Sequence, residues 1–235
     1  MSGLRWDLTI VIDDATNGIC AGVFAEEPGF WPRINSVRET VEQIGLFERL
    51  ASARSAADWE RATGYQAKRR HRIQFGRVMD ELGIEVIPSS SPQALGRSGR
   101  LLRTLKDRLG KELAGAGISA IAEANAFLRG YWPRFNAVFA LEPRNESGGF
   151  DPLVPDLKRS LDQVFCLKET VTIGRGGQVA YRGRVLQIPA DVRYGKSGAE
   201  AEVREYQDGS LAAYQGKRKL ATYDGSGRLL EAPPS

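Results

Sequence analysis

A stretch rich in proline, glycine, asparagine and serine, Glu142–Asp156, divides this chain into two parts with different sequence patterns. Before it, apolar residues recur mainly at helical spacing. After it, short β-rich runs alternate with glycine-containing turns between Glu169 and Tyr214. Such a change of period indicates two domains. We therefore predict an α/β domain over residues 1–140, a linker over 141–160 and a small all-β barrel over 161–235.

The composition is that of a soluble globular protein, with 42% hydrophobic and 26% charged residues. No apolar run approaches the roughly 18 residues that span a bilayer, and the first residues lack the pattern of a secretory signal. Cys20 and Cys166 are far apart and stand in no metal-binding spacing, which favours reduced thiols in the core. These features predict a cytoplasmic protein that does not contact a membrane.

The first domain opens with a β-hairpin pattern. One β-rich run, Leu8–Ile12, ends at Asp13 and Asp14, and a second, Ile19–Phe24, follows the turn residues Ala15–Gly18. We assign the two aspartates to the turn rather than to a metal site. Apolar periodicity then predicts three helices and a short buried strand: helices Asn35–Ile44, Gln74–Leu82 and Ile118–Phe139, the last kinked or interrupted at Trp132–Pro133, and strand Ile84–Ile87.

The sequence also predicts a long basic helix, Arg97–Leu113. Its leucines fall on one face and its cations broadly on the other: Leu102, Leu105, Leu109 and Leu113 against Arg97, Arg100, Arg103 and Lys111. The net charge of the chain is only +4, but positive charge is concentrated in this helix and in the block Lys68–Arg72. Clustered cations favour contact with a polyanion, although a merely solvated face has the same pattern.

Four motifs occur in a fixed order along the first domain. They are the hairpin segment Ile12–Thr16, the helix and strand Gln74–Glu85, the loop and helix start Ser91–Arg100, and the helical segment Leu105–Leu113. In this order they resemble the bacterial DDE transposases with an integrase core. The second domain, with Tyr181 and the turn Asp208–Ser210, resembles the small β-barrel that follows the catalytic core in such enzymes.

The resemblance implies a ribonuclease-H-like fold, in which helices flank a mixed sheet, followed by an SH3-like barrel. It also implies cleavage of transposon ends and strand transfer to DNA. That chemistry uses two Mg²⁺ ions to clamp the attacking and leaving oxygens of a phosphodiester. Such hard ions need several carboxylate oxygens, and the family supplies two aspartates and one glutamate from separate elements.

This chain departs from the family at each carboxylate position. The strand that carries the first aspartate belongs before the hairpin, where this sequence has only a short segment. Ala53 stands at the second position, with Asp58 as a weaker substitute candidate, and Gly99 stands at the third. Leu95 replaces a lysine that often faces DNA phosphate in the family. The sequence therefore predicts no catalytic residue, no metal site and no cofactor.

Together, these features predict a transposase-derived DNA-binding protein that is catalytically inactive. Non-specific contacts to DNA phosphates are assigned to six cations: Arg97, Arg100, Arg103, Lys68, Arg69 and Arg70. The resemblance further implies a homo-oligomer or association with an intact transposase. Two alternatives stay open, namely an active transposase with displaced ligands and a misassigned start, and a gene remnant without function.

Overall fold

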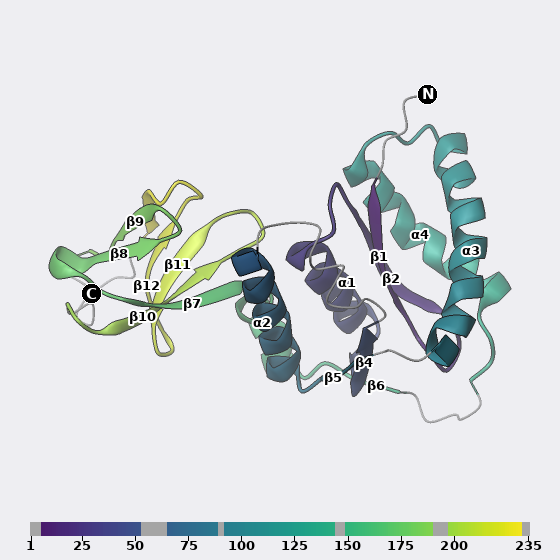
Figure 1. Ribbon diagram of the computed structural model, residues 1–235, viewed down its shortest axis with the longest axis horizontal. Helices are drawn as coiled ribbons and strands as arrows, with labels where there is room; N and C mark the ends of the chain where they lie inside the picture. The colour runs from purple at the N-terminus through teal and green to yellow at the C-terminus, as the bar shows by residue number, and fades with distance from the viewer. Residues whose placement is uncertain (1–5, 53–64, 89–91, 144–148, 190–196, 232–235) are drawn as a thin grey trace. The chain divides into compact units, whose positions relative to one another are not determined.

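The computed structural model describes residues 6–52, 65–88, 92–143, 149–189 and 197–231. Within these ranges the side chains of residues 52, 65–72, 88 and 92–98 are not described. The chain forms two compact units, Met1–Lys158 and Arg159–Ser235, whose elements are labelled in Figure 1. Each unit has its own hydrophobic core, and we describe them separately.

The first unit opens with the predicted hairpin, which is confirmed. Strand β1 (Asp7–Ile12) pairs antiparallel with strand β2 (Ile19–Ala25). The carboxylate of Asp13 holds the turn, because it accepts hydrogen bonds from the backbone N–H of Ala15 at 3.2 Å and from the Thr16 hydroxyl at 2.6 Å. Asp13 is thus a turn residue, as the sequence indicates.

Helix α4 (Ile121–Phe139) runs along the outer edge of β2 and replaces a neighbouring strand there. The side-chain amide of Asn125 accepts a bond from the N–H of Phe24 and donates one to its carbonyl, and Asn136 does the same to Ile19. The distance between the two asparagines along the helix matches the distance between Ile19 and Phe24 along the strand. Eleven helical residues rise about 16.5 Å, and five strand residues span about 17 Å. Two amides therefore satisfy backbone groups at both ends of the strand edge.

Close packing between α4 and β2 depends on a glycine. A Cβ at Gly22 would lie 2.6 Å from a ring carbon of Trp132, so no larger residue fits without movement of the indole. The helix is continuous through Trp132–Pro133, where the sequence predicts a kink or an interruption, with Pro133 inside it. Trp132 is buried beside Tyr131 and Phe135, and this aromatic packing anchors the helix through the proline.

Helix α3 (Pro92–Gly115) packs on the other side of α4, which lies between α3 and β2 in Figure 1. Its buried stripe consists of four leucines that join one core cluster with β2 and α4: Leu101, Leu105, Leu109 and Leu113. The sequence places Leu102 in this stripe instead, but Leu102 is only partly buried. The predicted helix is confirmed, and its apolar face is rotated slightly toward Leu101.

The remaining elements of the first unit are one helix before the basic block, one helix that contains it, and four short strands. They are α1 (Phe30–Gln43), β3 (Leu46–Phe47), β4 (Arg49–Ser52), α2 (Tyr65–Leu82), β5 (Glu85–Pro88) and β6 (Phe150–Asp151). Strands β4 and β5 are parallel, and β3 and β6 are antiparallel. The prediction of a buried strand at 84–87 is wrong in one respect, because Val86 and Ile87 are each 37% exposed. As described, that sheet has two strands, which leaves part of both side chains open to solvent.

The second unit is an antiparallel sheet with a packed hairpin. Helix α5 (Pro155–Val164) crosses the boundary between the units, so the predicted linker 141–160 contains β6 and the start of α5. The β-rich runs that the sequence shows at 169–173, 178–181, 184–188, 200–204 and 211–214 form five strands. They are β7 (Leu167–Thr172), β8 (Gln178–Tyr181), β9 (Arg184–Gln187), β10 (Glu200–Glu205) and β11 (Leu211–Gln215). A short 3-10 turn, η2 (Arg175–Gly177), precedes β8.

Two further strands of this unit were not predicted, β12 (Arg218–Tyr223) and β13 (Leu229–Glu231). The order in the sheet is β13-β12-β11-β10-β7, and β8 and β9 form a separate hairpin. Side chains from the hairpin and the sheet share one core, in which Tyr181, Leu186 and Leu220 are almost completely buried. The SH3-like barrel and the ribonuclease-H-like core stay predictions.

Candidate nucleic-acid interface

The exposed side of α3 carries a stripe of cations, which we call the outer stripe. It consists of Arg100, Arg103 and Lys111, all exposed, with Asp107 among them. The helical repeat explains the stripe, because these positions lie opposite the buried leucines. The leucines fix the helix against α4, so the cations project from a rigid support into solvent.

The cations of the outer stripe make no ion pair within 4 Å in the part of the chain that the structure describes, although Asp107 lies on the same face. On α1, Arg38 pairs with Glu42 at 2.8 Å, and on α2, Arg77 pairs with Glu81 at 2.8 Å. Arg100, Arg103 and Lys111 make no ion pair of this kind with any described residue. Their charge is therefore available to an external anion.

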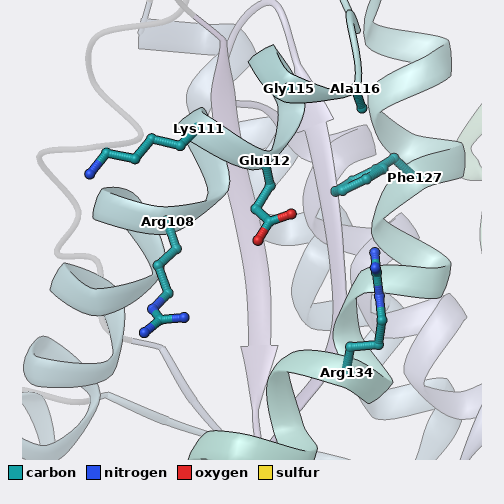
Figure 2. Close-up of a pocket in the computed structure, with 7 residues that line it drawn as sticks. All are labelled: Arg108, Lys111, Glu112, Gly115, Ala116, Phe127 and Arg134. Atoms are coloured by element: carbon teal, nitrogen blue, oxygen red, sulfur yellow. The ribbon is translucent and has the colours of Figure 1, made fainter.

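Beside the outer stripe, a hollow of about 470 Å³ lies between the C-terminal half of α3 and α4. Its lining comes from both helices and from the residue that follows α3: Arg108, Lys111, Glu112, Gly115, Ala116, Phe127 and Arg134. Figure 2 shows the carboxylate of Glu112 between the two helices, with Phe127 and Arg134 facing it from α4 and the ammonium of Lys111 directed away. The hollow thus joins three cations, one carboxylate and an aromatic ring.

Aromatic rings hold both arginines of the hollow. The guanidinium carbon of Arg108 lies 4.9 Å from the ring centre of Phe139, and that of Arg134 lies 5.8 Å from Phe127 and 5.9 Å from Tyr131. Such contacts attract the cation to the ring face and limit its motion. Burial raises the pKa of Tyr131, and the nearby carboxylate of Glu112 raises it further.

The structure places the predicted DNA-contacting residues on two helices. Arg100 and Arg103 are exposed on α3, and Arg97 belongs to the same helix, although its side chain is outside the described residues. The predicted contacts in the basic block, Lys68, Arg69 and Arg70, lie in the first half of α2, again without described side chains. The structure therefore brings Arg100 and Arg103 together and leaves their relation to the block untested.

Of the family's carboxylate positions, only the third falls on described residues. Ala53 and the substitute candidate Asp58 lie outside them. Gly99 is in α3, and no described atom outside the helix's own nearby backbone and the two chain neighbours lies within 4 Å of a Cβ added there. Among the described residues, no three histidine, cysteine, aspartate or glutamate side chains are grouped to hold a metal ion. The absence of a metal site stays a prediction.

The hollow itself was not predicted from the sequence. A signal for it exists in α4, because Phe127 and Arg134 are seven residues apart and therefore share a face. That Arg108 meets this face depends on how α3 packs against α4, which the sequence alone does not specify.

Within the described residues, no helix combines the length and apolar character needed to cross a bilayer.

Comparison with known proteins links part of the chain to transposases. No protein-family model matches it. Over 141 residues, or 59% of the chain, it is 37% identical to "Putative transposase y4bF" of Sinorhizobium fredii, and the match covers 30% of that protein. Over 139 residues, or 57% of the chain, it is 33% identical to the transposase for insertion sequence IS1202 of Streptococcus pneumoniae, and covers 29% of it. The chain thus spans less than a third of each curated relative, and over more than half of its own length it is a homologue of proteins named transposases.

Proposed function

We propose that this protein is a DNA-binding protein derived from a DDE transposase with a ribonuclease-H-like core, and that it does not cut DNA. Similarity to two proteins named transposases supports the ancestry. The four ordered motifs of the first unit support the DDE type. Under this proposal the second unit is the SH3-like barrel that follows the core.

The observation that carries the proposal is the unpaired cationic outer stripe of α3. From Arg100 to Lys111 the helix rises about 16.5 Å, which corresponds to about five base pairs of B-DNA at about 3.4 Å each. Cations at this spacing on a rigid helix suit contact with several phosphates along one groove edge. Such contacts fix position on a duplex and carry no sequence information.

Loss of catalysis is proposed because of Gly99. In the resembled family this position on the basic helix supplies a carboxylate to the metal pair. A glycine has no side chain and cannot ligate Mg²⁺ through one. The residues of this chain therefore offer phosphate contact on α3 without the ligand that the chemistry needs at that place.

The test is a titration of a fluorescent DNA duplex with the whole protein at several salt concentrations, with and without Mg²⁺, followed by a denaturing gel. We expect binding that weakens steeply as salt rises, and no Mg²⁺-dependent nicking. Arg103→Gln should weaken binding and lower the salt slope by about 1. Arg129→Gln is the matched control, since it removes an exposed cation from α4 and should leave the slope nearly unchanged.

Each part of the proposal has an outcome that contradicts it. No binding at low salt would refute the DNA-binding function, and a chain recovered only as aggregate would favour the gene remnant. Nicking that a chelator abolishes would refute inactivity and favour an active transposase with displaced ligands, which makes Asp58→Asn the next variant. Association with a second copy or with an intact transposase is part of the proposal, and co-purification tests it.

A further inference from the structure

We infer that the hollow between α3 and α4 is a binding site for phosphate groups, with Arg108 and Arg134 as the residues that hold them. If the bound phosphate belongs to a nucleic acid, this inference rests on the proposed function, because the hollow then adds a second set of phosphate contacts to those of the outer stripe. The phosphate chemistry itself depends only on the hollow.

Ring contacts hold both arginines in place, and their terminal N–H groups are available to a ligand. Arg108 is stacked on Phe139, and Arg134 on Phe127 and Tyr131. The Nε of Arg134 donates to the carbonyl of Gly130 at 3.2 Å, which fixes the plane of the guanidinium. Among the described residues, the terminal N–H groups of both arginines have no acceptor within hydrogen-bond distance. A guanidinium presents these donors as a fork that fits two oxygens of one phosphate.

The charge around the hollow favours an anion. Three cations and one carboxylate, that of Glu112, line the hollow, and the ammonium of Lys111 is directed away from the carboxylate (Figure 2). This carboxylate makes no ion pair within 4 Å with any cation in the described ranges, so it does not neutralise Arg108 or Arg134 directly. Its remaining effect is to oppose an incoming anion, since like charges at this range repel. Glu112 would therefore weaken phosphate binding and keep it reversible.

The position and size of the hollow suit a phosphate that belongs to a longer chain. Its volume is about 470 Å³, and it is open to solvent rather than enclosed, so one phosphate of an extended ligand could enter it. Lys111 belongs both to the outer stripe and to the rim of the hollow, so the two basic surfaces are continuous. Along α3, Arg108 lies about 12 Å beyond Arg100, which is about three to four nucleotides of a strand. A nucleic-acid strand on the outer stripe would thus reach the hollow.

The experiment follows the side-chain Nε–H signals of the arginines by NMR in the whole protein. One series adds inorganic phosphate, a second adds sodium chloride at equal ionic strength, and a third adds a short DNA duplex. We expect the signals of Arg108 and Arg134, assigned from their variants, to shift saturably with phosphate and not with chloride. Arg134→Gln should weaken phosphate binding about fivefold, and Arg129→Gln should not.

Glu112→Gln provides a second variant that leaves both arginines intact. Removal of the opposing charge should strengthen phosphate binding about twofold to threefold. This gain cannot arise from misfolding, so it keeps the inference testable if Arg134→Gln proves unstable. Phosphate shifts that do not saturate, or an unchanged affinity in both variants, would overturn the inference.

The three series also separate this inference from the proposed function. Saturable shifts with both phosphate and duplex identify the nucleic-acid backbone as a ligand, whereas shifts with phosphate alone identify a free phosphate or nucleotide. If the duplex binds through Arg103 while the signals of Arg108 and Arg134 remain unmoved in all series, the inference fails and the proposed function stands. If phosphate saturates the hollow and the duplex does not bind, the proposed function fails alone.

Discussion

At the scale of single residues, two glycines in the first unit have opposite roles. Gly99 lies in α3, where a Cβ would have no described neighbour within 4 Å outside the helix's own backbone and the two chain neighbours, and Gly22 lies against the ring of Trp132. We expect Gly99→Ala to raise the free energy of unfolding by about 0.5–1 kcal/mol, because alanine lowers the entropy cost of the helix. Gly22→Ala, the same substitution, should lower it by about 1–3 kcal/mol through overpacking.

Urea unfolding followed by tryptophan fluorescence checks this pair, with the wild type as reference. A loss of stability in Gly99→Ala would mean that packing requires glycine there. A structural requirement for glycine would then explain the presence of Gly99 as well as the loss of a metal-binding carboxylate does.

The thiol of Cys20 gives a second prediction at this scale. Burial raises its pKa to about 11, and the nearby carboxylate of Asp13 contributes to the rise. At pH values well below its ordinary pKa of 9.0, the thiol is protonated in both states, so it does not change stability with pH. Between pH 9 and 11 only the unfolded chain loses the proton, so the free energy of unfolding should fall as pH rises.

Urea midpoints between pH 7 and 11 measure this fall, and Cys20→Ala should reduce its slope. Labelling supplies an independent check, because Cys20 and Cys166 are both buried. A disulfide reagent at pH 8 should react slowly with the native protein and rapidly with both thiols in denaturant. Rapid labelling of the native protein would contradict the burial of these thiols.

At the scale of elements, the contact between α4 and β2 rests on Asn125 and Asn136. Asn136→Ala leaves the N–H and carbonyl of Ile19 without partners at a partly buried site. We expect the free energy of unfolding to fall by about 2–3 kcal/mol. Asn35→Ala, on α1 and without a hydrogen bond to any described residue, is the control and should change stability by less than about 0.5 kcal/mol.

Equal effects of the two asparagine substitutions on the urea midpoint would refute this role. A reduced slope of the unfolding curve in Asn136→Ala alone would instead indicate that α4 separates from β2 before the rest of the unit unfolds.

The same elements show which structural features a sequence pattern can predict and which it cannot. The leucine repeat of α3 specifies both its helix and its exposed cations, since a period of 3.6 is a local property. Leu101 replaces Leu102 in the core because the neighbours of the helix decide its rotation. The amide contacts of Asn125 and Asn136 were not predictable, because they join residues more than a hundred positions apart. The hollow was missed for the same reason, since Arg108 and Phe127 meet only in the fold.

Strands β12 and β13 were missed for a local reason. β12 begins with the polar run Arg218 and Lys219, and β13 has three residues, so neither gives a strong β signal. Both are supported by pairing with β11 and with each other, which a single-strand pattern does not contain.

At the scale of the whole molecule, the two separate cores predict two separable unfolding events. All four tryptophans of the sequence lie before residue 158, whereas the core of the second unit contains Tyr181 and Tyr223. Tryptophan fluorescence therefore reports on the first unit alone. Leu220 is fully buried in the second core, so Leu220→Ala should destabilise that unit by about 2–5 kcal/mol.

Two signals recorded in the same urea series test whether the two units unfold separately. Near-ultraviolet circular dichroism contains signals from tyrosines of both units, among them Tyr131 in the first core and Tyr181 and Tyr223 in the second. In Leu220→Ala, part of this signal should be lost at lower urea, while the tryptophan fluorescence midpoint stays in place. Leu105→Ala, at an equally buried position in the first core, should have the reverse effect. If either variant moves both midpoints together, the chain unfolds as one cooperative unit, and DNA-binding losses in α3 variants would then have to be separated from effects on the second unit.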